Sequence, residues 1–480
     1  MESLLKEINV VVSGLFLPAV LFVSGAFFFI RIGTAVFSPR FLRAALGKRR
    51  AVTRGAEATR AQSEERKGKE NERSPFSSLC LALAGTLGVG NISGVTAAIT
   101  VGGPGAVFWI WVSAVASSVL KFSETVLAMR YRKKDKAGVY RGGAYLYIKE
   151  GLGAPSLAAV FCALCIFTSF TMGSITQTRA AADGVFFSLG IPPVVCGAVF
   201  FIVVLFLSLG GGKRISDFTV KLIPTLCLGY VLLSAAVIFI FRKDLAAVTS
   251  VILSEAFTPR AGVGGVFGVL TSDTVRYGVA RGIMSNEAGC GTAPFAHARA
   301  ETESAVRQGV FGIIEVLTDT LVLCTLTAYV VLLSGVSGGG SATETAINAF
   351  SSALGDGVRV FLGISLFLFA LGSVAGWSFY GQESVRALGG GKRTLFVYGT
   401  ALALSSFIGC IMSEGAVWEL ADLSISLMAV INVGAVLMLS PYVVTLTREF
   451  YSVCRVRSSR REGAPHSDNI FRFSENDKGA

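Results

Sequence analysis

Long stretches without a charged residue alternate along this chain with shorter polar and basic segments. A helix that crosses a bilayer needs roughly 20 mainly apolar residues, so most of these stretches each predict one crossing. The longest, residues 74–120, predicts two crossings that are separated at Gly102-Gly-Pro-Gly105. The pattern therefore predicts an all-α polytopic membrane protein with eleven transmembrane helices, at residues 7–31, 76–101, 104–130, 156–182, 185–209, 219–241, 262–297, 306–334, 356–384, 394–413 and 416–447.

Two of the apolar stretches are interrupted by glycine-rich polar runs, at Gly85–Gly94 and Gly282–Pro294. Inside a bilayer, irregular backbone persists only where it is buried in protein or lines a cavity. Paired interruptions in corresponding segments of two halves point to the substrate site of a secondary transporter. Close helix packing through small residues is the alternative. It does not explain Asn91 in the first run or Ser285-Asn-Glu287 in the second, because buried polar side chains are costly.

A broken helix offers two kinds of binding group. Its free N–H groups suit a carboxylate, and its free carbonyl groups suit a sodium ion or an ammonium group. A zwitterionic amino acid satisfies both ends at once. Side chains in the two runs add further donors and acceptors: Asn91 and Ser93 in the first, and Ser285, Asn286 and Thr292 in the second.

The positive charges behind the net charge of +12 are clustered on alternate predicted loops. Residues 31–73 contain twelve Lys or Arg and residues 130–149 contain seven, whereas the predicted loops 335–355 and 412–418 contain none. Positive residues favour the cytoplasmic side of a membrane. We therefore expect a cell-membrane protein with its N-terminus outside and its C-terminus in the cytoplasm, and no nucleic-acid partner.

The predicted crossings divide into one extra helix and two groups of five, each headed by an interrupted segment. An odd number of crossings per group gives the two groups opposite orientations, which is an inverted repeat. Lys243–Glu255 is expected to form a surface helix within the connection. The predicted division is 1–31 for the extra helix, 32–75 for a cytoplasmic basic linker, 76–241 for the first five-helix repeat, 242–261 for an extracellular connection, 262–450 for the second repeat and 451–480 for a cytoplasmic tail.

The sequence predicts neither an enzyme nor a bound cofactor, because no nucleophile–base or metal-ligand cluster is evident. Nine cysteines are scattered mostly through apolar segments. Cys162 and Cys165 form a C-x-x-C motif, which we interpret as small residues that pack within a membrane helix. Only two histidines occur, His297 and His466, which leaves little room for histidine chemistry.

Several long motifs carry a family resemblance. Gly90-Asn-Ile-Ser-Gly94 is followed by Gly102-Gly-Pro-Gly-Ala-Val-Phe-Trp109, and Arg281–Pro294 is followed by His297 and Gln308-Gly309. These motifs resemble the signatures of the alanine or glycine:cation symporter family, over about residues 5–450. The resemblance implies a leucine-transporter-like fold of eleven helices and sodium-coupled uptake of a small neutral amino acid.

The resemblance also implies which residues bind the amino acid. They lie in both interrupted segments and in the fourth and ninth crossings, where Trp377 would wall the pocket and limit side-chain size. An interfacial position for Trp377 is the alternative. The implied substrate-binding residues are Asn91, Gly94, Gln177, Ser285, Asn286, Gly289, Ser373 and Trp377.

The implied sodium site shows departures from the family pattern. Val89 and Gly372-Ser373 stand where the family usually has hydroxyl side chains, and Thr178-Arg179 replaces a Ser-Asn pair. Hard cations prefer oxygen ligands, although backbone carbonyls also serve. Sodium coupling is expected, and proton coupling or an altered substrate stays open. The candidate sodium ligands are Gly88, Val89, Gly372, Ser373 and Asp319.

Ionisable residues within the apolar segments are functional candidates because their burial is costly. Glu315 and Asp319 are four residues apart and are expected to share one helix face, with Asp319 as the ion-site candidate. Lys121 and Glu124 are expected to pair near the inner membrane face. The remaining candidates are Glu287 within the second run, Asp273, Arg276 and Arg281 as gate or structural ion pairs, and Arg179, for which a place near the pocket and an interfacial place both stay open.

From another functional class, a sensor or a channel that keeps the fold is the alternative to a symporter. A sensor usually adds a signalling domain, and the predicted tail is too short to fold alone. A channel needs a continuous polar path, which the sequence does not address.

Overall fold

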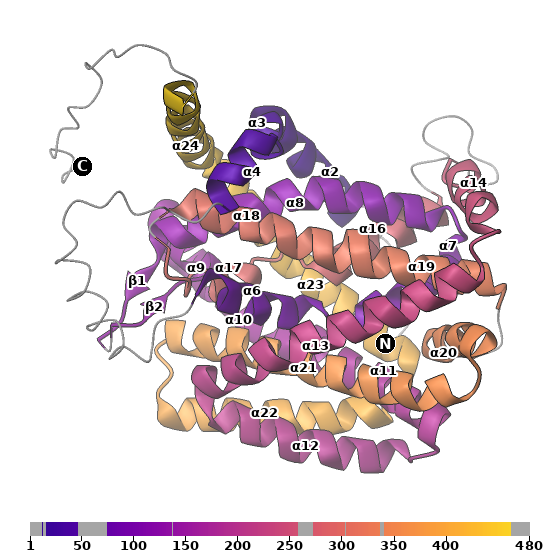
Figure 1. The fold of residues 1–480 in the computed structure, drawn as a ribbon. Coiled ribbons are helices and arrows are strands. Elements are labelled where there is room, and N and C mark those ends of the chain that lie inside the picture. Colours follow the sequence, from indigo (N-terminus) through magenta and orange to yellow (C-terminus); the bar gives the residue numbers. More distant parts are fainter. Residues whose placement is uncertain are drawn as a thin grey trace, which may run out of the picture.

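The computed structural model (Figure 1) describes residues 12, 16–46, 74–136, 138–257, 272–302, 304–336 and 340–461, and most of these residues are helical. The first part of the chain forms α2 Leu17–Phe28, the π-helix η2 Phe29–Gly33, α3 Thr34–Val36, α4 Pro39–Leu46, α6 Pro75–Thr86, the 3-10 turn η3 Val89–Asn91, α7 Ser93–Gly102, α8 Ala106–Tyr131, β1 Lys133–Lys134, β2 Tyr140–Arg141, α9 Ala144–Leu146, the π-helix η4 Tyr147–Gly151, α10 Pro155–Phe170, the π-helix η5 Thr171–Ile175, α11 Thr176–Leu189, α12 Pro193–Leu209, α13 Gly211–Ile240 and α14 Leu245–Glu255.

The second part begins after residues 258–271, which the structure does not describe. It forms α16 Asp273–Asn286, α17 Ala293–His297, α18 Ala305–Val316, the π-helix η6 Leu317–Cys324, α19 Thr325–Ser334, α20 Ala342–Leu354, α21 Gly357–Ala387, α22 Lys392–Ile411, α23 Glu414–Met438 and α24 Ser440–Arg461. The short strands β1 and β2 pair antiparallel, with Lys133 opposite Arg141.

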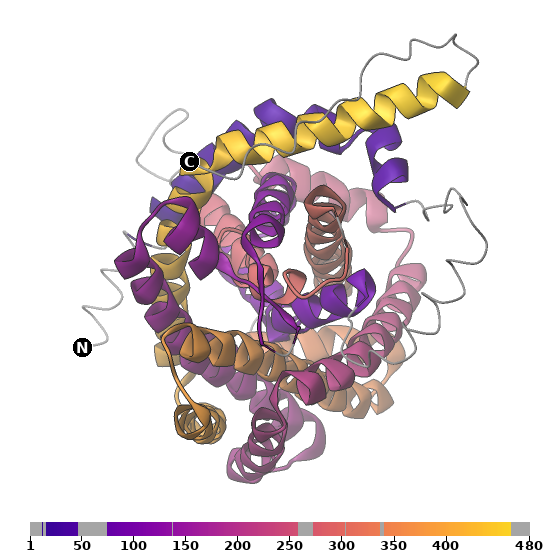
Figure 2. The same ribbon diagram turned by 90° about the vertical axis from the view of Figure 1, so that its left-hand side faces the viewer.

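The long helices lie side by side, and Figure 2 shows them end-on around the middle of the molecule. Within the described residues, eight helical runs are long and apolar enough to cross a membrane, and α6 with α7 makes a ninth if the bent pair is one span. α12 is apolar but shorter, at 17 residues. The chain is therefore a multi-pass membrane protein. The count of eleven crossings and the inverted repeat remain predictions.

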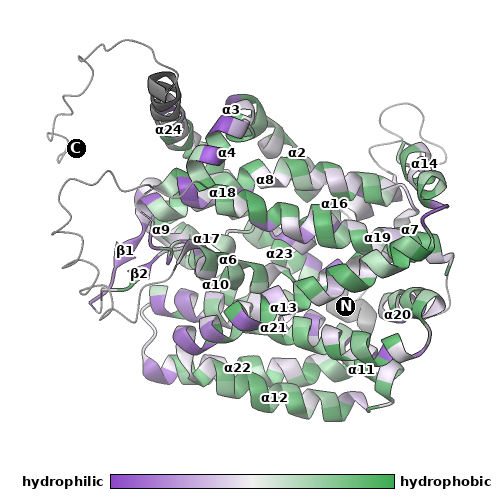
Figure 3. Ribbon diagram, in the orientation of Figure 1, coloured by the Kyte–Doolittle hydropathy of each residue, from purple (hydrophilic) through white to green (hydrophobic). Residues whose placement is uncertain are grey.

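Hydrophobic residues predominate along the outer helices, such as α12 and α22 (Figure 3). Large exposed hydrophobic residues are numerous on α12, α13 and α22, for example Ile202, Leu232 and Val397. A water-soluble protein rarely exposes so continuous an apolar surface, whereas lipid tails solvate it. α8 and α21 are among the most enclosed of the long helices, and α13 is the least enclosed. The core that holds the polar site thus lies against α8 and α21.

Several predicted boundaries were wrong. The predicted loop 335–355 contains α20, which begins at the N-cap Ser341, whose hydroxyl accepts a hydrogen bond from the Glu344 N–H. The fourth crossing continues to Leu189, and the fifth begins at Pro193 and not at 185, because Gly190 takes a left-handed conformation with φ of 67° and ends α11 there. The predicted eleventh crossing 416–447 divides at Leu439 into α23 and α24.

The surface helix, the tail and the domain boundaries were also predicted. The surface helix expected at 243–255 is present as α14. α24 extends to Arg461, so the first residues of the predicted tail are helical. Most of the linker 32–75, the start of the seventh crossing and the rest of the tail lie outside the described residues. The domain boundaries otherwise remain predictions.

Candidate functional site

The first interruption bends the chain by 64° between α6 and α7. Two amide groups that the break leaves without helical partners bind side chains instead. The Gly88 N–H donates to Asn91 Oδ1 at 3.2 Å, and the Val89 N–H donates to Gln177 Oε1 at 3.1 Å. Buried backbone groups need such partners. Gln177, at the start of α11, therefore holds the break open from a second helix.

The second interruption lies between α16 and α17, later than expected. Gly282 to Asn286 still belong to α16, so the expectation that the interruption begins at Gly282 was wrong. The helix ends at Glu287, whose φ of 51° makes it the only non-glycine residue with a positive φ in the described chain. Gly289 and Gly291, with φ of 86° and 76°, carry the turn. Such strain in a residue with a side chain commonly marks a functional site.

The two interruptions meet at the carboxylate of Asp319, which lies on η6. Asn91 Nδ2 donates to Asp319 Oδ1 at 2.8 Å, and the Ser285 hydroxyl donates to Oδ2 at 2.6 Å. The Thr320 hydroxyl donates to the same oxygen at 2.8 Å, and Asn91 Nδ2 also reaches Ser285 Oγ at 3.1 Å. All four residues are buried. The structure thus joins the first break, the second break and the ion-site candidate in one polar cluster, which we call the Asp319 cluster.

Asn286 binds beside this cluster. Its Nδ2 donates to Thr320 Oγ1 at 3.3 Å, and its Oδ1 accepts from the Ala288 N–H at 3.0 Å. Gly289 does not face this cluster. An ideal Cβ at Gly289 would lie 2.6 Å from Leu21 Cδ2, and the Gly289 carbonyl accepts a hydrogen bond from Asn432 Nδ2. Of the predicted second-break residues, Ser285 and Asn286 therefore lie at the cluster and Gly289 packs toward α2.

The other sodium-site candidates do not all come together. Ser373 donates to the Gly85 carbonyl at 3.0 Å, and its Cβ lies 3.2 Å from the ideal Cβ position of Gly88. An ideal Cβ at Gly372 would instead lie 3.1 Å from Ile223 Cδ1 on α13. Gly88 and Ser373 are thus neighbours at the first break, near Val89 in the chain, and Gly372 faces a neighbouring helix.

Trp377 lies in the interior and not in an interfacial belt, because it is 0% exposed. Its indole N–H donates to Glu287 Oε1 at 2.9 Å, and Thr292 donates to Glu287 Oε2 at 2.8 Å. The ring lies so close to Gly173 that an ideal Cβ there would stand 2.4 Å from Trp377 Cγ. The second break, through Glu287, therefore fixes the orientation of the tryptophan.

Open space lies beside the first break. Gly94 is buried in the first turns of α7, yet an ideal Cβ at this position would meet no atom within 4 Å. An ideal Cβ at Gly90 would have the Ser285 Cα as its nearest neighbour, at 4.0 Å. Space beside two buried glycines can admit a small group, since buried interiors are otherwise closely packed.

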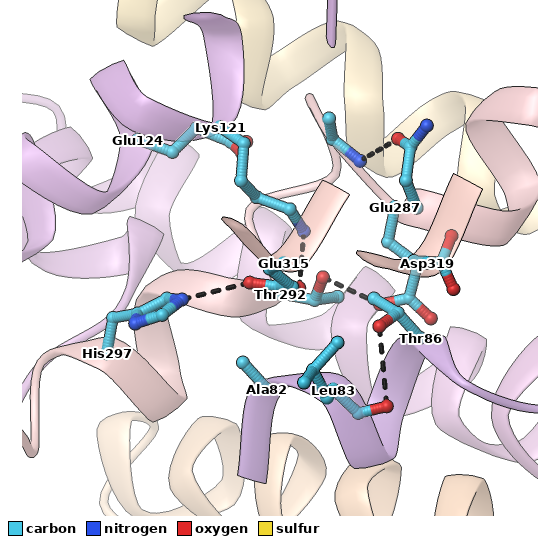
Figure 4. A network of polar contacts seen from close by, with 12 residues as sticks. Ala82, Leu83, Thr86, Lys121, Glu124, Glu287, Thr292, His297, Glu315 and Asp319 are labelled. Atoms are coloured by element: carbon cyan, nitrogen blue, oxygen red, sulfur yellow. Dashed lines mark hydrogen bonds and ion pairs between the residues drawn. The ribbon is translucent and has the colours of Figure 1, made fainter. Parts of the chain in front are cut away.

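The predicted pair of Lys121 and Glu124 is not formed. Lys121 Nζ instead binds Glu315 Oε1 at 3.1 Å, and both side chains are almost completely buried (Figure 4). Glu124 Oε1 accepts from the Gly291 N–H at 3.0 Å and from Asn432 Nδ2. The spacing of Lys121 and Glu124 along one helix favoured a local pair. In the structure the partner of Lys121 is instead Glu315, which lies on another helix, α18.

Glu315 and Asp319 likewise have different partners despite their spacing of four. The wider π-helical turn of η6 begins at Leu317 between them. Of the expected gate or structural pairs, Arg281 binds Asp422 at 3.3 Å and Arg276 lies 3.7 Å from Asp273.

Arg179 binds Asp183 at 2.7 Å and the Cys410 carbonyl at 3.1 Å. This arrangement ties Arg179 to its own helix and to α22.

Sequence reasoning missed His297 and Asn432. His297 Nε2 lies 2.9 Å from Glu315 Oε2, and Asn432 Oδ1 accepts from the Tyr147 hydroxyl at 2.5 Å. Both residues are fully buried and bridge separate helices. The available signal was a polar residue inside an apolar stretch, but the sequence does not show which distant helix supplies the partner.

Broken helices that meet around a buried carboxylate within a bundle of apolar helices define a secondary transporter. The chain belongs to the sodium:alanine symporter family, whose model matches residues 1–462. It is 32% identical over 461 residues to the sodium/alanine symporter AgcS of Methanococcus maripaludis, covering 94% of this chain and 97% of that one. It is 34% identical over 383 residues to the probable sodium/glutamine symporter GlnT of Bacillus subtilis, covering 79% of each.

A solved structure supports the fold. The structure of MhsT in complex with L-phenylalanine matches with a TM-score of 0.53 at 14% identity, covering 76% of this chain and 89% of that one. At this identity the likeness concerns the fold alone, which is that of leucine-transporter-like proteins. Family and fold together establish a cation-coupled amino-acid transporter and not an enzyme.

Proposed function

We propose that this protein couples the inward movement of sodium to the uptake of a small neutral amino acid, alanine or glycine, by alternating access. The observation that carries the proposal is the Asp319 cluster, where side chains of both broken helices meet on one buried carboxylate. Any ligand that bridges the two breaks there binds two elements at once, and helices of this kind move relative to the rest in transporters.

The cation binds at the Asp319 cluster. A sodium ion prefers hard oxygen ligands, and the cluster supplies a carboxylate and the hydroxyls of Ser285 and Thr320. The hydroxyls now donate to the carboxylate and keep lone pairs for a cation. A second set of oxygens lies at the first break, where Ser373 meets the Gly85 carbonyl. With the carbonyls of Gly88 and Val89, it is a second candidate cation site.

The amino acid binds between the breaks. The N-terminal end of α7 presents free amide groups and the positive end of a helix dipole, which suit the substrate carboxylate. The carbonyls at the end of α16 suit its ammonium group. Asn91, Gln177, Ser285 and Asn286 surround the breaks, and the substrate lies among them with Gly94 alongside.

Two features favour a small side chain. An ideal Cβ at Gly94 would meet no atom within 4 Å, and Trp377 is held in place by Glu287 and Gly173. A fixed ring excludes larger side chains, since buried walls yield little. The relative GlnT is named for glutamine. The enclosed Trp377 is what favours alanine or glycine over that larger substrate here.

We also propose an orientation. Hydrophilic residues gather at the end of the bundle that carries β1, β2 and the end of α17 (Figure 3). Lys133, Lys134 and Arg299 lie there. Positive residues favour the cytoplasm, so this end is the inner one, with the C-terminus inside and the N-terminus outside.

The test is uptake of radiolabelled alanine, glycine and glutamine into proteoliposomes, with a sodium gradient and a proton gradient imposed separately. Sodium-driven, saturable uptake of alanine or glycine is expected, with glutamine poorly transported. Binding without uptake would indicate a sensor, and uptake that does not saturate would indicate a channel. Uptake driven by protons and indifferent to sodium would overturn the sodium assignment.

A further inference from the structure

Two helices, α4 and α24, each follow directly on a run that is long and apolar enough to cross a membrane. α4 begins at Pro39, soon after the run Leu17–Val36, and α24 begins at Ser440, soon after the run Ala421–Met438. Figure 1 shows α24 nearly end-on where α8 and α18 run lengthwise, and Figure 2 shows the reverse. α24 therefore runs across the direction of the membrane helices, as a helix at a bilayer surface does.

The short helix α4 is attached to the bundle by aromatic packing and by a hydrogen bond. Phe41 is fully buried, and its ring centroid lies 5.2 Å from that of Phe450 on α24 and 6.4 Å from that of Phe122 on α8. Arg307 Nε, on α18, donates to the Ala45 carbonyl at 2.8 Å. Phe41 and Ala45 are four positions apart and both buried, so they define the inward face of α4.

Three exposed arginines flank the contact between α4 and α24. Arg40 and Arg43 are three positions apart and exposed, so they share an outward side of α4. Arg448 is exposed on α24, two positions before Phe450, whose ring packs on Phe41. We call these three residues the arginine face.

The arginine face lacks the ion pairs that arginines form elsewhere. Arg179 and Arg359 each bind a nearby aspartate, at 2.7 Å and 3.1 Å. The guanidinium groups of Arg40, Arg43 and Arg448 form no ion pair or hydrogen bond with any described residue. Their donors are therefore available to a ligand from outside the chain.

Few carboxylates on the surrounding helices offset this positive charge. The segments η2, α3 and α4 contain no acidic residue, and α24 contains only Glu449. α8 and α18 pack against these helices, but their acidic residues are buried: Glu124 accepts from the Gly291 N–H, and Glu315 binds Lys121. The acidic residues of α23 all lie in its first half, away from α24. The arginine face with Glu449 is therefore net positive and suits an anion.

Exposed apolar residues precede both basic helices in the chain. Ile30 on η2 and Met438 at the end of α23 are largely exposed, and Leu46 at the end of α4 is exposed as well. A phospholipid matches both features, because its acyl chains cover apolar side chains and its phosphate accepts hydrogen bonds from guanidinium groups. A free anion has no acyl chain and uses only the arginines.

We propose that α4 and α24 bind the headgroup of an anionic phospholipid, with Arg40, Arg43 and Arg448 as its phosphate ligands. The acyl chains lie along the apolar residues that precede each helix. Because Phe41 and Arg307 attach α4 to α24, α8 and α18, the bound lipid stabilises the packing of these helices. The proposal does not depend on which cation or amino acid the protein transports.

The experiment titrates the full chain, purified in detergent, with phosphatidylglycerol or with phosphatidylcholine that carries the same acyl chains. Native mass spectrometry counts the bound lipids, and thermal unfolding reports their effect on stability. Phosphatidylglycerol is expected to bind at concentrations at least about tenfold lower, since each arginine near an anionic headgroup contributes about fivefold. It should also raise the melting temperature more than phosphatidylcholine does. Equal binding of the two lipids would overturn the proposal.

Inorganic phosphate and glycerol phosphate distinguish a lipid from a free anion. Both carry the charged group of the headgroup but no acyl chains, so neither is expected to displace phosphatidylglycerol at millimolar concentrations. Displacement by either compound would show that the arginine face binds a soluble anion, and would overturn the lipid assignment.

Substitutions on the two helices locate the site. Arg43→Gln and Arg448→Gln should each weaken phosphatidylglycerol binding about fivefold, and Arg40→Gln combined with Arg43→Gln about 25-fold. Arg359→Gln removes a partly exposed arginine of α21 that binds Asp356, and is the control with wild-type binding. Wild-type binding in both Arg43→Gln and Arg448→Gln would overturn the proposal. If the double variant does not fold, as judged by thermal unfolding without added lipid, the single variants decide.

Discussion

Trp377 is held on three sides. Glu287 accepts its indole N–H, Tyr380 packs against it edge-on with ring centroids 5.7 Å apart, and Gly173 leaves room for its ring. Rigid aromatic side chains set steric limits at little conformational cost. At the residue scale, we therefore propose that this ring and the space beside Gly94 limit substrate size.

Replacing Trp377 by alanine is expected to widen the accepted range toward larger neutral amino acids. The change creates space, and one methylene in an apolar pocket alters discrimination by about tenfold or more. Competition by serine, valine and glutamine for labelled alanine uptake measures it. Trp377→Phe keeps one aromatic ring but loses the N–H and part of the bulk, so its size preference should stay closer to wild type than that of Trp377→Ala. An unchanged range in Trp377→Ala would assign the ring to packing.

Replacing Gly94 by alanine is expected to have the opposite effect. The added methyl group occupies the open space beside the first break, so alanine uptake should weaken by about tenfold relative to glycine uptake. The measurement is the ratio of kcat/KM for the two substrates. Gly434→Ala, on α23 with no neighbour within 4 Å of the added carbon, is the matched control. Equal loss for both substrates would show that the space is not part of the site.

Replacing Asp319 by asparagine is expected to raise the half-saturating sodium concentration by about tenfold or more, because charged ligands tune cation affinity. Coupling is reciprocal, so alanine should also tighten sodium binding less in the variant. Sodium titrations of uptake and of alanine binding measure both effects. Asp183→Asn removes another buried carboxylate, paired with Arg179, and serves as control. Sodium dependence that survives unchanged in Asp319→Asn would move the cation to the oxygens around Ser373.

At the scale of elements, the first break depends on a residue from another helix. Gln177 accepts from the Val89 N–H, and η5 lies directly before it in the chain. Because Gln177 belongs to α11, a substitution in α11 can alter the first break although the sequence of the break itself is unchanged.

Replacing Gln177 by alanine is expected to reduce saturable uptake by at least about tenfold, because loss of the acceptor leaves a buried amide unpaired. Asn286→Ala should act in the same direction at the second break. Membrane insertion should be unaffected, as judged by the yield of purified protein. Gln382→Ala is a control with a buried amide that binds Ser208 and not a break. Wild-type kinetics in Gln177→Ala and Asn286→Ala would contradict their assigned roles.

Some of this architecture followed from the sequence and some did not. The two breaks were predictable because runs of glycine and polar residues within apolar stretches disfavour a continuous membrane helix. The π-helices η5 and η6 were not, since their extra residue leaves no compositional signal, and α20 was missed because its short amphipathic run resembles a loop. The partners of Glu315 were missed because contacts between helices depend on packing and not on spacing.

At the scale of the whole molecule, one buried carboxylate binds three arginines at the end of the bundle that carries β1 and β2. Glu383 is 2% exposed and binds Arg141 at 2.7 Å, Arg386 at 2.8 Å and Arg299 at 3.0 Å. These arginines come from β2, from α21 and from the segment after α17. The cluster therefore links parts of the chain that are far apart in sequence.

Replacing Glu383 by glutamine is expected to destabilise the protein by about 3 kcal/mol, because several guanidinium groups lose a buried partner. Arg386→Gln is the comparison. Its pair is local and half-buried, so its loss should cost about 0.5 kcal/mol or less. Thermal unfolding in detergent measures both variants. Equal melting temperatures for wild type and Glu383→Gln would show that the cluster adds no net stability.

The π-helix η6 affects how this transporter is compared with others. In an α-helix each residue advances about 100° around the axis, so one surplus residue rotates everything after it by that angle relative to a regular helix. An alignment to a relative whose helix lacks the bulge would pair residues that point in different directions beyond Leu317. Counterparts of Asp319 in such relatives should therefore be sought by superposing the partners Asn91 and Ser285, and not by counting from Glu315.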